Sequence, residues 1–159
     1  MPHKLLSLYD SVAIRLEKYG APLLILTIRL FMANIFFTSG WLKFGNYLNG
    51  NWATTVYLFA EEYKTPLLPP EVAAVMGTAG ELGFSVLLVL GLFARFGALG
   101  LIFMTAVIQF TYAYETIHYL WALLLAVILV QGAGSISLDY ILKNRFRSQM
   151  PPNLLEMHP

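Results

Sequence analysis

Residues 21–44, APLLILTIRLFMANIFFTSGWLKF, decide the fold class of this chain. Arg29 and Lys43 are the only charged side chains in this stretch. A helix rises ~1.5 Å per residue, so a stretch of ~20 residues matches the ~30 Å hydrocarbon core of a bilayer. Pro22 suits the first turn of a helix. The stretch therefore predicts a transmembrane helix that begins near residue 21.

Three more apolar stretches follow, at about 71–93, 96–114 and 118–132. The chain of 159 residues is 58% hydrophobic and 12% charged, whereas soluble domains usually carry ~25% charged residues. A soluble four-helix core would need polar outer faces, and the last two stretches have almost none. The sequence therefore predicts an all-α integral membrane protein, with a four-transmembrane-helix bundle over residues 21–142.

Residues 1–20 have a different pattern, in which apolar and charged side chains occupy opposite faces of a helix. The apolar positions recur at helical spacing: Leu5, Leu8, Val12, Leu16 and Tyr19. Charged side chains occupy most of the remaining face: Lys4, Asp10, Arg15, Glu17 and Lys18. This pattern is typical of an amphipathic helix that lies in the membrane interface. We therefore expect an N-terminal amphipathic interfacial helix on the cytoplasmic face.

The connection at 45–70 is too long for a simple turn between two spans. Four of its aromatic and apolar residues share one helical face: Trp52, Val56, Phe59 and Tyr63. They predict a short helix at the membrane surface. We expect it to cap the bundle, and a lid over a substrate is the alternative.

The basic residues predict the orientation of the chain in the membrane, because cytoplasmic loops carry an excess of lysine and arginine. Seven of them fall on one side: Lys4, Arg15, Lys18, Arg95, Lys143, Arg145 and Arg147. The other side has Lys43 and Lys64. We therefore expect a multi-pass protein of the cell inner membrane with both termini in the cytoplasm, an outer loop at 45–70 and a cytoplasmic tail at 143–159.

Composition also excludes several chemistries. The chain has no cysteine, so it offers no disulfide, iron–sulfur cluster or thiolate zinc site. Its three histidines are His3, His118 and His158, so a span has no second histidine to hold a haem with His118. The net charge of +1, without a basic run, gives nucleic acid no electrostatic footprint. We expect no intrinsic cofactor and no metal site, so any redox group must come from a partner or from the lipid.

Two charges lie deep within predicted spans, where an unpaired charge costs at least ~2.5–3.5 kcal/mol. Arg29 is expected ~12 Å and Glu81 ~20 Å from the inner face at 1.5 Å per residue. The length of an arginine side chain can cover that difference. We therefore predict a buried Arg29–Glu81 ion pair, helped by Ser85 or Gln109. Such a pair would either lock the bundle or serve as a catalytic or proton-relay site.

A second polar group is expected near the outer surface, at the ends of the first, third and fourth spans. Its members are Trp41, Lys43, Glu115, His118 and Trp121. Aromatic residues at this depth commonly form an interfacial belt, and Lys43 can extend toward the headgroups. The functional alternative is a shallow site for a quinone head group or a partner, at which His118 exchanges a proton. We predict that Lys43 and His118 approach each other there.

Three motifs resemble those of a known family. The first contains Arg29, Phe36, Gly40 and Lys43, within Phe-Phe-Thr-Ser-Gly-Trp-Leu-Lys. The second contains Glu81, the run Leu-Leu-Val-Leu-Gly-Leu-Phe at 87–93, and Arg95. The third is Gly-Ser-Ile-Ser-Leu-Asp at 134–139. Together they resemble the DoxX family from about residue 23 to residue 139, in the same order and at similar spacings.

The resemblance implies a four-helix inner-membrane protein of bacterial type. Members of the family are linked to quinone reduction by thiosulfate, to membrane oxidoreductase complexes and to maturation of copper-binding peptides. The Gly-Trp-x-Lys form of the first motif and the amphipathic N-terminus are similar to that last subgroup. A quinone and a partner protein are therefore the ligands that the resemblance implies.

We expect an accessory subunit of a membrane oxidoreductase system near the quinone pool. The alternative is a non-enzymatic scaffold or partner-binding protein, including a role in copper-peptide maturation. A carrier is disfavoured because the spans show no internal repeat. The residues expected to form a polar site are Arg29, Lys43, Glu81, Gln109 and His118. Enzymatic activity, catalytic residues and oligomeric state stay open at this stage.

Overall fold

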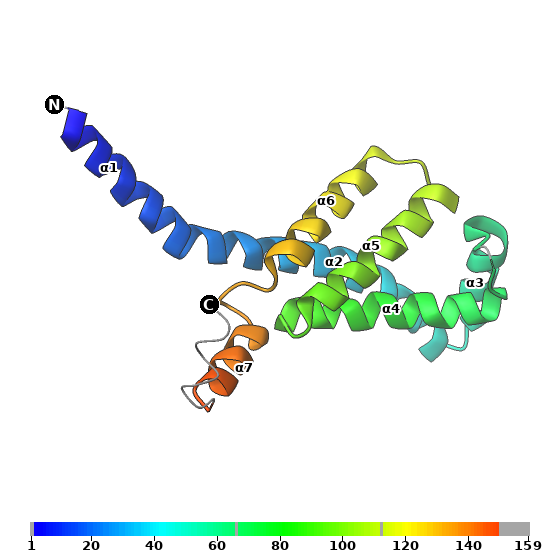
Figure 1. Cartoon of the computed structure of the whole chain (residues 1–159). Helices are drawn as coiled ribbons and strands as arrows, with labels where there is room; N and C mark the ends of the chain where they lie inside the picture. The colour runs from blue at the N-terminus through cyan, green and yellow to red at the C-terminus, as the bar shows by residue number, and fades with distance from the viewer. Residues whose placement is uncertain (1, 66, 112, 150–159) are drawn as a thin grey trace.

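The computed structural model describes residues 2–65, 67–111 and 113–149, with side chains from Leu5 onward, and these residues form helices joined by short connections (Figure 1). The helices are α1 (Pro2–Arg15), η1 (Leu16–Gly20), α2 (Ala21–Leu48), α3 (Trp52–Tyr57), η2 (Leu58–Tyr63), α4 (Pro70–Leu90), α5 (Ala94–Thr111), α6 (Thr116–Gln131) and α7 (Leu138–Arg147). The elements η1 and η2 are π-helical turns. His158 and the predicted tail beyond residue 149 lie outside the described residues.

Helices α2, α4, α5 and α6 form the bundle. Helix α2 packs against α4 and α6, and α5 packs against the same two helices. The core between them is apolar and fully buried, with Met32, Phe36, Leu88, Leu101, Leu125 and Ile128 as its largest apolar side chains. Large apolar side chains on the outside are exposed, such as Phe31, Phe103 and Val130. A bundle that is apolar both inside and outside is typical of a protein surrounded by lipid.

Three helical segments are long and apolar enough to cross a membrane: Leu5–Leu48, Pro70–Leu90 and Ala94–Thr111. Helix α6 is apolar but has only 16 residues, which corresponds to ~24 Å. The fold is therefore that of a helical membrane protein, with three full-length apolar helices and one shorter one.

Local signals in the sequence explain where α4 begins and ends. Pro70 occupies the first turn of α4. Amides in the first turn have no acceptor within the helix, so the missing amide hydrogen of proline costs no hydrogen bond there. Gly91 follows the last turn with a left-handed φ of 62°. The amide of Gly91 bonds to the carbonyl of Leu88, and the amide of Leu92 bonds to that of Leu87. These two bonds form a Schellman motif, which closes the helix three residues earlier than the predicted end at 93.

The outer connection folds back over α4. Phe59 packs with Ala73 and Ala74, and its ring lies so close to Gly77 that a Cβ there would be 2.6 Å from Phe59 Cζ. Trp52, Val56 and Tyr63 pack around this cluster. The four residues expected to share a face do pack together, and they lie against the start of α4.

The N-terminal segment differs from the expected separate interfacial helix. Helix α1 runs through η1 into α2 without a break and extends beyond the bundle (Figure 1). The apolar residues Leu5 and Leu8 of α1 and Leu16 of η1 are exposed. A further helix, α7, begins within the predicted bundle and continues into the predicted tail at 143–159.

Candidate functional site

Arg29 lies at the end of the bundle where α4 and α6 finish, and it bonds to backbone oxygens. Its Nε donates to the carbonyl of Leu88 at 2.8 Å, and Nη2 donates to that of Val89 at 2.9 Å. Its Nη1 donates to the carbonyls of Ala133 and Ile136 at 2.7 and 2.8 Å. The guanidinium therefore ties α2 to the end of α4 and to the loop that follows α6. The C-terminal end of α4 suits a cation because the carbonyls of its last turn carry partial negative charge.

Arg29 and its four carbonyl partners form a clamp, and hydrogen bonds hold the loops around it in place. The carboxylate of Asp139 accepts from the amides of Phe93 and Ala94 at the start of α5, and the amide of Asp139 donates to the carbonyl of Gly91. Ser137 caps α7 by accepting from the amide of Tyr140. A Cβ at Gly91 would lie 2.5 Å from Arg29 Nη2, so this position needs glycine for space as well as for its φ.

Lys43 and Glu81 form a buried ion pair toward the other end of α2. Lys43 Nζ lies 2.9 Å from Glu81 Oε1 and 2.8 Å from Oε2. Ser39 joins the pair, because its hydroxyl accepts from Lys43 Nζ at 2.7 Å and donates to Glu81 Oε1 at 3.2 Å. Gly40 allows α2 to approach α4 here, since a Cβ at this position would lie 2.9 Å from Glu81 Cβ. The two charges therefore balance each other inside the bundle.

The predicted Arg29–Glu81 ion pair is wrong. Glu81 pairs with Lys43, and Arg29 is satisfied by four carbonyls. Ser85 bonds to neither, and its buried hydroxyl has no hydrogen-bond partner. The physical reason is that α2 presents two cations at different depths. The close approach at Gly40 brings Lys43 to the carboxylate, whereas Arg29 lies level with the last turn of α4.

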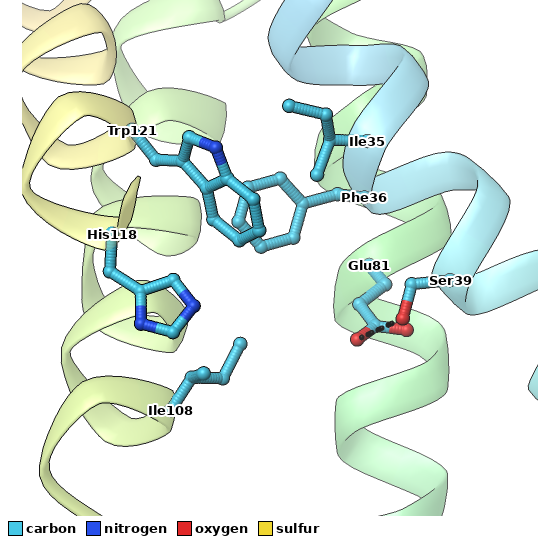
Figure 2. A pocket seen from close by; sticks show the side chains of 7 residues that line it. All are labelled: Ile35, Phe36, Ser39, Glu81, Ile108, His118 and Trp121. Carbon is cyan, nitrogen blue, oxygen red and sulfur yellow. Dashed lines mark hydrogen bonds between the residues drawn. The ribbon is translucent and has the colours of Figure 1, made fainter. Parts of the chain in front are cut away.

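A cavity of about 120 Å³ opens beside this ion pair. Its lining residues come from four helices: Ile35, Phe36, Ser39, Glu81, Ile108, His118 and Trp121 (Figure 2). Phe36 and Trp121 meet edge to face, with ring centroids 5.8 Å apart. Figure 2 shows the carboxylate of Glu81 and the imidazole of His118 on opposite sides of this space. The cavity therefore has mainly apolar and aromatic walls, with the polar side chains of Ser39 and Glu81 on one side and His118 on the other.

The hydrogen bonds of His118 decide which ring nitrogen faces the cavity. His118 Nδ1 lies 2.7 Å from Gln109 Oε1, which also accepts from the amide of Glu115 at 3.3 Å. Because the same oxygen accepts from a backbone N–H, the partner of Nδ1 is an acceptor, and Nδ1 must carry a proton. In the neutral ring, Nε2 is then a hydrogen-bond acceptor, and Figure 2 shows it directed into the cavity.

The structure brings together some of the predicted site residues and separates others. Glu81 and His118 share the cavity, and Gln109 orients His118. Helices α2 and α6 are in contact, and both Lys43 and His118 are buried, but Lys43 does not line the cavity. Arg29 belongs to the separate clamp at the other end of α2.

Other members of the predicted outer group are not part of the cavity. Trp41 is exposed, as expected for a residue that faces lipid or the interface. Glu115 is exposed and contributes its backbone amide. Ser39 was missed, although its position one helical turn before Lys43 placed both on one face. Among the described residues, no three His, Asp or Glu side chains gather as a metal site would require.

Comparison with known proteins identifies the family. The model of the DoxX family matches residues 24–113. This chain belongs to the DoxX family. A relative from Haemophilus influenzae, described as an uncharacterized protein, is 27% identical over 142 residues, which cover 81% of this chain and 89% of that protein. No solved structure gives a significant match.

Two of the three motifs lie within the matched residues 24–113, and the third, at 134–139, follows them. All three converge on the two charged anchors. Arg29 comes from the first motif, Gly91 from the second, and Asp139 from the third, and all three meet at the clamp. Lys43 of the first motif and Glu81 of the second form the ion pair. Residues far apart in this DoxX chain therefore hold α2 at two levels and leave the cavity between them and α6.

Proposed function

We propose that this DoxX protein is an accessory subunit of a membrane oxidoreductase system, and that the cavity between Glu81 and His118 binds the head group of a quinone in its reduced form, a quinol. The observation that carries the proposal is the pair of hydrogen-bond acceptors on opposite sides of one aromatic-walled cavity. The carboxylate of Glu81 is one acceptor and Nε2 of neutral His118 is the other. Two facing acceptors match a ring that carries two hydroxyl groups.

The size and charge of the cavity fit such a ring. A cavity of ~150 Å³ in an engineered protein holds benzene, so about 120 Å³ corresponds to roughly one ring. Ile35, Ile108 and Trp121 are only half-buried, so substituents and an apolar tail can extend toward the lipid. Lys43 balances the charge of Glu81, which favours a neutral ligand over an ion.

The residues of the chain have separate roles in this proposal. A bound quinol supplies two electrons and two protons to whichever redox partner accepts them. His118 Nε2 accepts a hydrogen bond or a proton from one hydroxyl, while Gln109 keeps the ring in the required tautomer. Glu81 accepts from the other hydroxyl, and Lys43 holds the carboxylate in place. Phe36 and Trp121 exclude water from the face of the ring.

A binding measurement with a short-tailed quinol tests the proposal. Trp121 lines the cavity, so its fluorescence should fall when the quinol enters the purified protein. The quinol should bind more tightly than the corresponding quinone, which has two acceptors and no donor. Ile108→Phe should fill the cavity and abolish binding, whereas Ile117→Phe, at an exposed position of α6, should not. Equal binding to both variants would contradict the proposal.

A non-enzymatic scaffold is the second candidate, and one observation favours it. Arg29, Lys43 and Glu81 are all satisfied by groups of the same chain, as they would be in a purely structural bundle. A scaffold should retain its partner protein in mild detergent in both Ile108→Phe and Ile117→Phe. A quinol-dependent accessory subunit should retain its partner in both variants but support electron transfer only in Ile117→Phe.

We also propose that the protein spans the inner membrane four times, with both termini in the cytoplasm. The basic residues support this orientation. Seven of them lie near the clamp or in the terminal helices, whereas Lys43 and Lys64 lie toward the other end of the bundle. Helix α6 is short, but it packs against α2 and α5 within the bundle, so a locally thinner bilayer or flanking loops can accommodate it.

A further inference from the structure

We propose that α7 is a surface anchor that binds the anionic phospholipid headgroups of the membrane that the bundle spans. The inference is independent of the quinol site, because it rests on a different helix at the other end of the molecule. Helix α7 starts at Leu138, next to the end of α4, and Figure 1 shows it turning away across that end. Its ten residues correspond to ~15 Å, which is too short to cross a bilayer.

The depth of α7 follows from its attachment. The amide of Asp139 donates to the carbonyl of Gly91 at 2.9 Å, and Gly91 directly follows the last residue of α4. Helix α4 has 21 residues and measures ~31 Å, which matches the thickness of the hydrocarbon core. Gly91 therefore lies at the edge of the hydrocarbon, and α7 begins at the level of the headgroups.

The faces of α7 match that level. Leu138, Ile141, Leu142 and Phe146 fall on one side at 100° per residue, and all four are exposed in the structure. Arg145 falls on the same side, and its long side chain can extend from there to the headgroups. An apolar face of this kind would rest on the acyl chains just below the headgroups. Phe146 is 64% exposed, so nothing in the described part of the chain already covers it.

The charges of α7 indicate an anionic surface rather than a neutral one. Lys143, Arg145 and Arg147 are cations, and no ion pair joins them to any acidic side chain that the structure describes. Asp139, the single acid of this helix, is held by the amides of Phe93 and Ala94. Basic residues beside a transmembrane helix attract anionic lipid, with each one strengthening binding by roughly fivefold.

A single fluorescent label can locate α7, because the chain has no cysteine of its own. Phe146→Cys places one thiol on the apolar face, and Asn144→Cys places one on the opposite face as a matched control. Each full-length protein is labelled with an environment-sensitive dye and reconstituted in phosphatidylcholine vesicles with or without phosphatidylglycerol. With phosphatidylglycerol, lipid-borne quenchers should reach the label at 146 and aqueous quenchers the label at 144.

Neutralising the cations tests the headgroup contact itself. Adding Lys143→Gln, Arg145→Gln and Arg147→Gln to Phe146→Cys should abolish the effect of phosphatidylglycerol on the label. The binding of α7 to the anionic surface should weaken roughly a hundredfold. In the protein that keeps its cations, raising salt from about 0.1 M to about 0.5 M should release the label only from anionic vesicles. Equal lipid contact in both vesicle types, or exposure to water in both, would overturn the proposal. So would lipid contact that appears only when an acidic partner protein is added.

Discussion

Lys43 and Glu81 form a two-pronged ion pair, with the amine 2.9 and 2.8 Å from the two carboxylate oxygens, and both side chains are about 95% buried. Because the pair neutralises its own charge, it costs less to bury than either partner alone. This relationship lets a carboxylate line the cavity without leaving an unbalanced charge beside it.

Breaking this pair should destabilise the protein strongly. Glu81→Leu leaves Lys43 as an unpaired buried cation, and we expect a loss of ~3–5 kcal/mol in unfolding free energy. The double variant Lys43→Met with Glu81→Leu should lose less, because no charge remains. Thermal unfolding in detergent measures both, with Glu71→Leu at an exposed position of α4 as the control. A Glu81→Leu protein that melts like the wild type would show that the pair contributes nothing.

The clamp should distinguish arginine from lysine. Arg29→Lys keeps the positive charge, but a single amine cannot reach four carbonyls spread over the end of α4 and the loop after α6. We expect the free energy of unfolding to fall by ~3–5 kcal/mol, as is typical when a buried charge network is broken. The control is Arg95→Lys, because Arg95 is exposed and makes one bond to the carbonyl of Val130. If the two variants unfold at the same temperature, the clamp has no special stability.

Gly91 should tolerate no side chain. In Gly91→Ala the new Cβ would lie 2.5 Å from Arg29 Nη2 and 2.6 Å from Ser137 Cβ, at a left-handed φ of 62°. We expect the backbone strain alone to lower the free energy of unfolding by at least ~1–3 kcal/mol. Gly83→Ala is the matched control within α4, since nothing lies within 4 Å of its Cβ, and it should gain up to ~1 kcal/mol. Chemical unfolding in detergent compares the two, and equal stabilities would refute the crowding argument.

The tautomer of His118 can be measured directly. Nitrogen-15 NMR of the imidazole should show a protonated Nδ1 and a bare Nε2 in the neutral ring. Gln109→Leu removes the acceptor and should shift the ring toward the other tautomer, because Nδ1 then has no partner. Gln131→Leu, at the exposed end of α6, should leave the spectrum unchanged. A wild-type spectrum with the proton on Nε2 would contradict the assignment of acceptors in the cavity.

The topology follows from reporter fusions. A fusion after Arg147 should report the cytoplasm, and a fusion within 49–53 should report the outer side. The distribution of basic residues gives the direction. In the four-span arrangement the chain crosses the membrane an odd number of times between the two fusion sites, so the two sites lie on opposite sides. If both fusions report the same side, the number of crossings between them is even and α6 does not cross.

The sequence by itself determined the helical membrane fold and placed most helix ends to within a few residues. Apolar stretches and end signals act locally, so Pro70 and Gly91 fix the limits of α4 whatever packs against it. The sequence also identified which polar residues would be buried, because Arg29, Glu81 and Gln109 lie inside apolar stretches and are indeed buried.

Only the tertiary structure decided which of these groups meet. The close approach of α2 and α4 at Gly40 assigned Lys43 rather than Arg29 to Glu81. The meeting of the end of α4 with the loop after α6 gave Arg29 its four carbonyls, which no pattern of side chains reveals. The cavity likewise depends on how α6 stands against α2, since His118 and Glu81 are 37 positions apart in the sequence. Helical periodicity fixes the face on which a residue lies, but the depth and crossing of packed helices fix its partner.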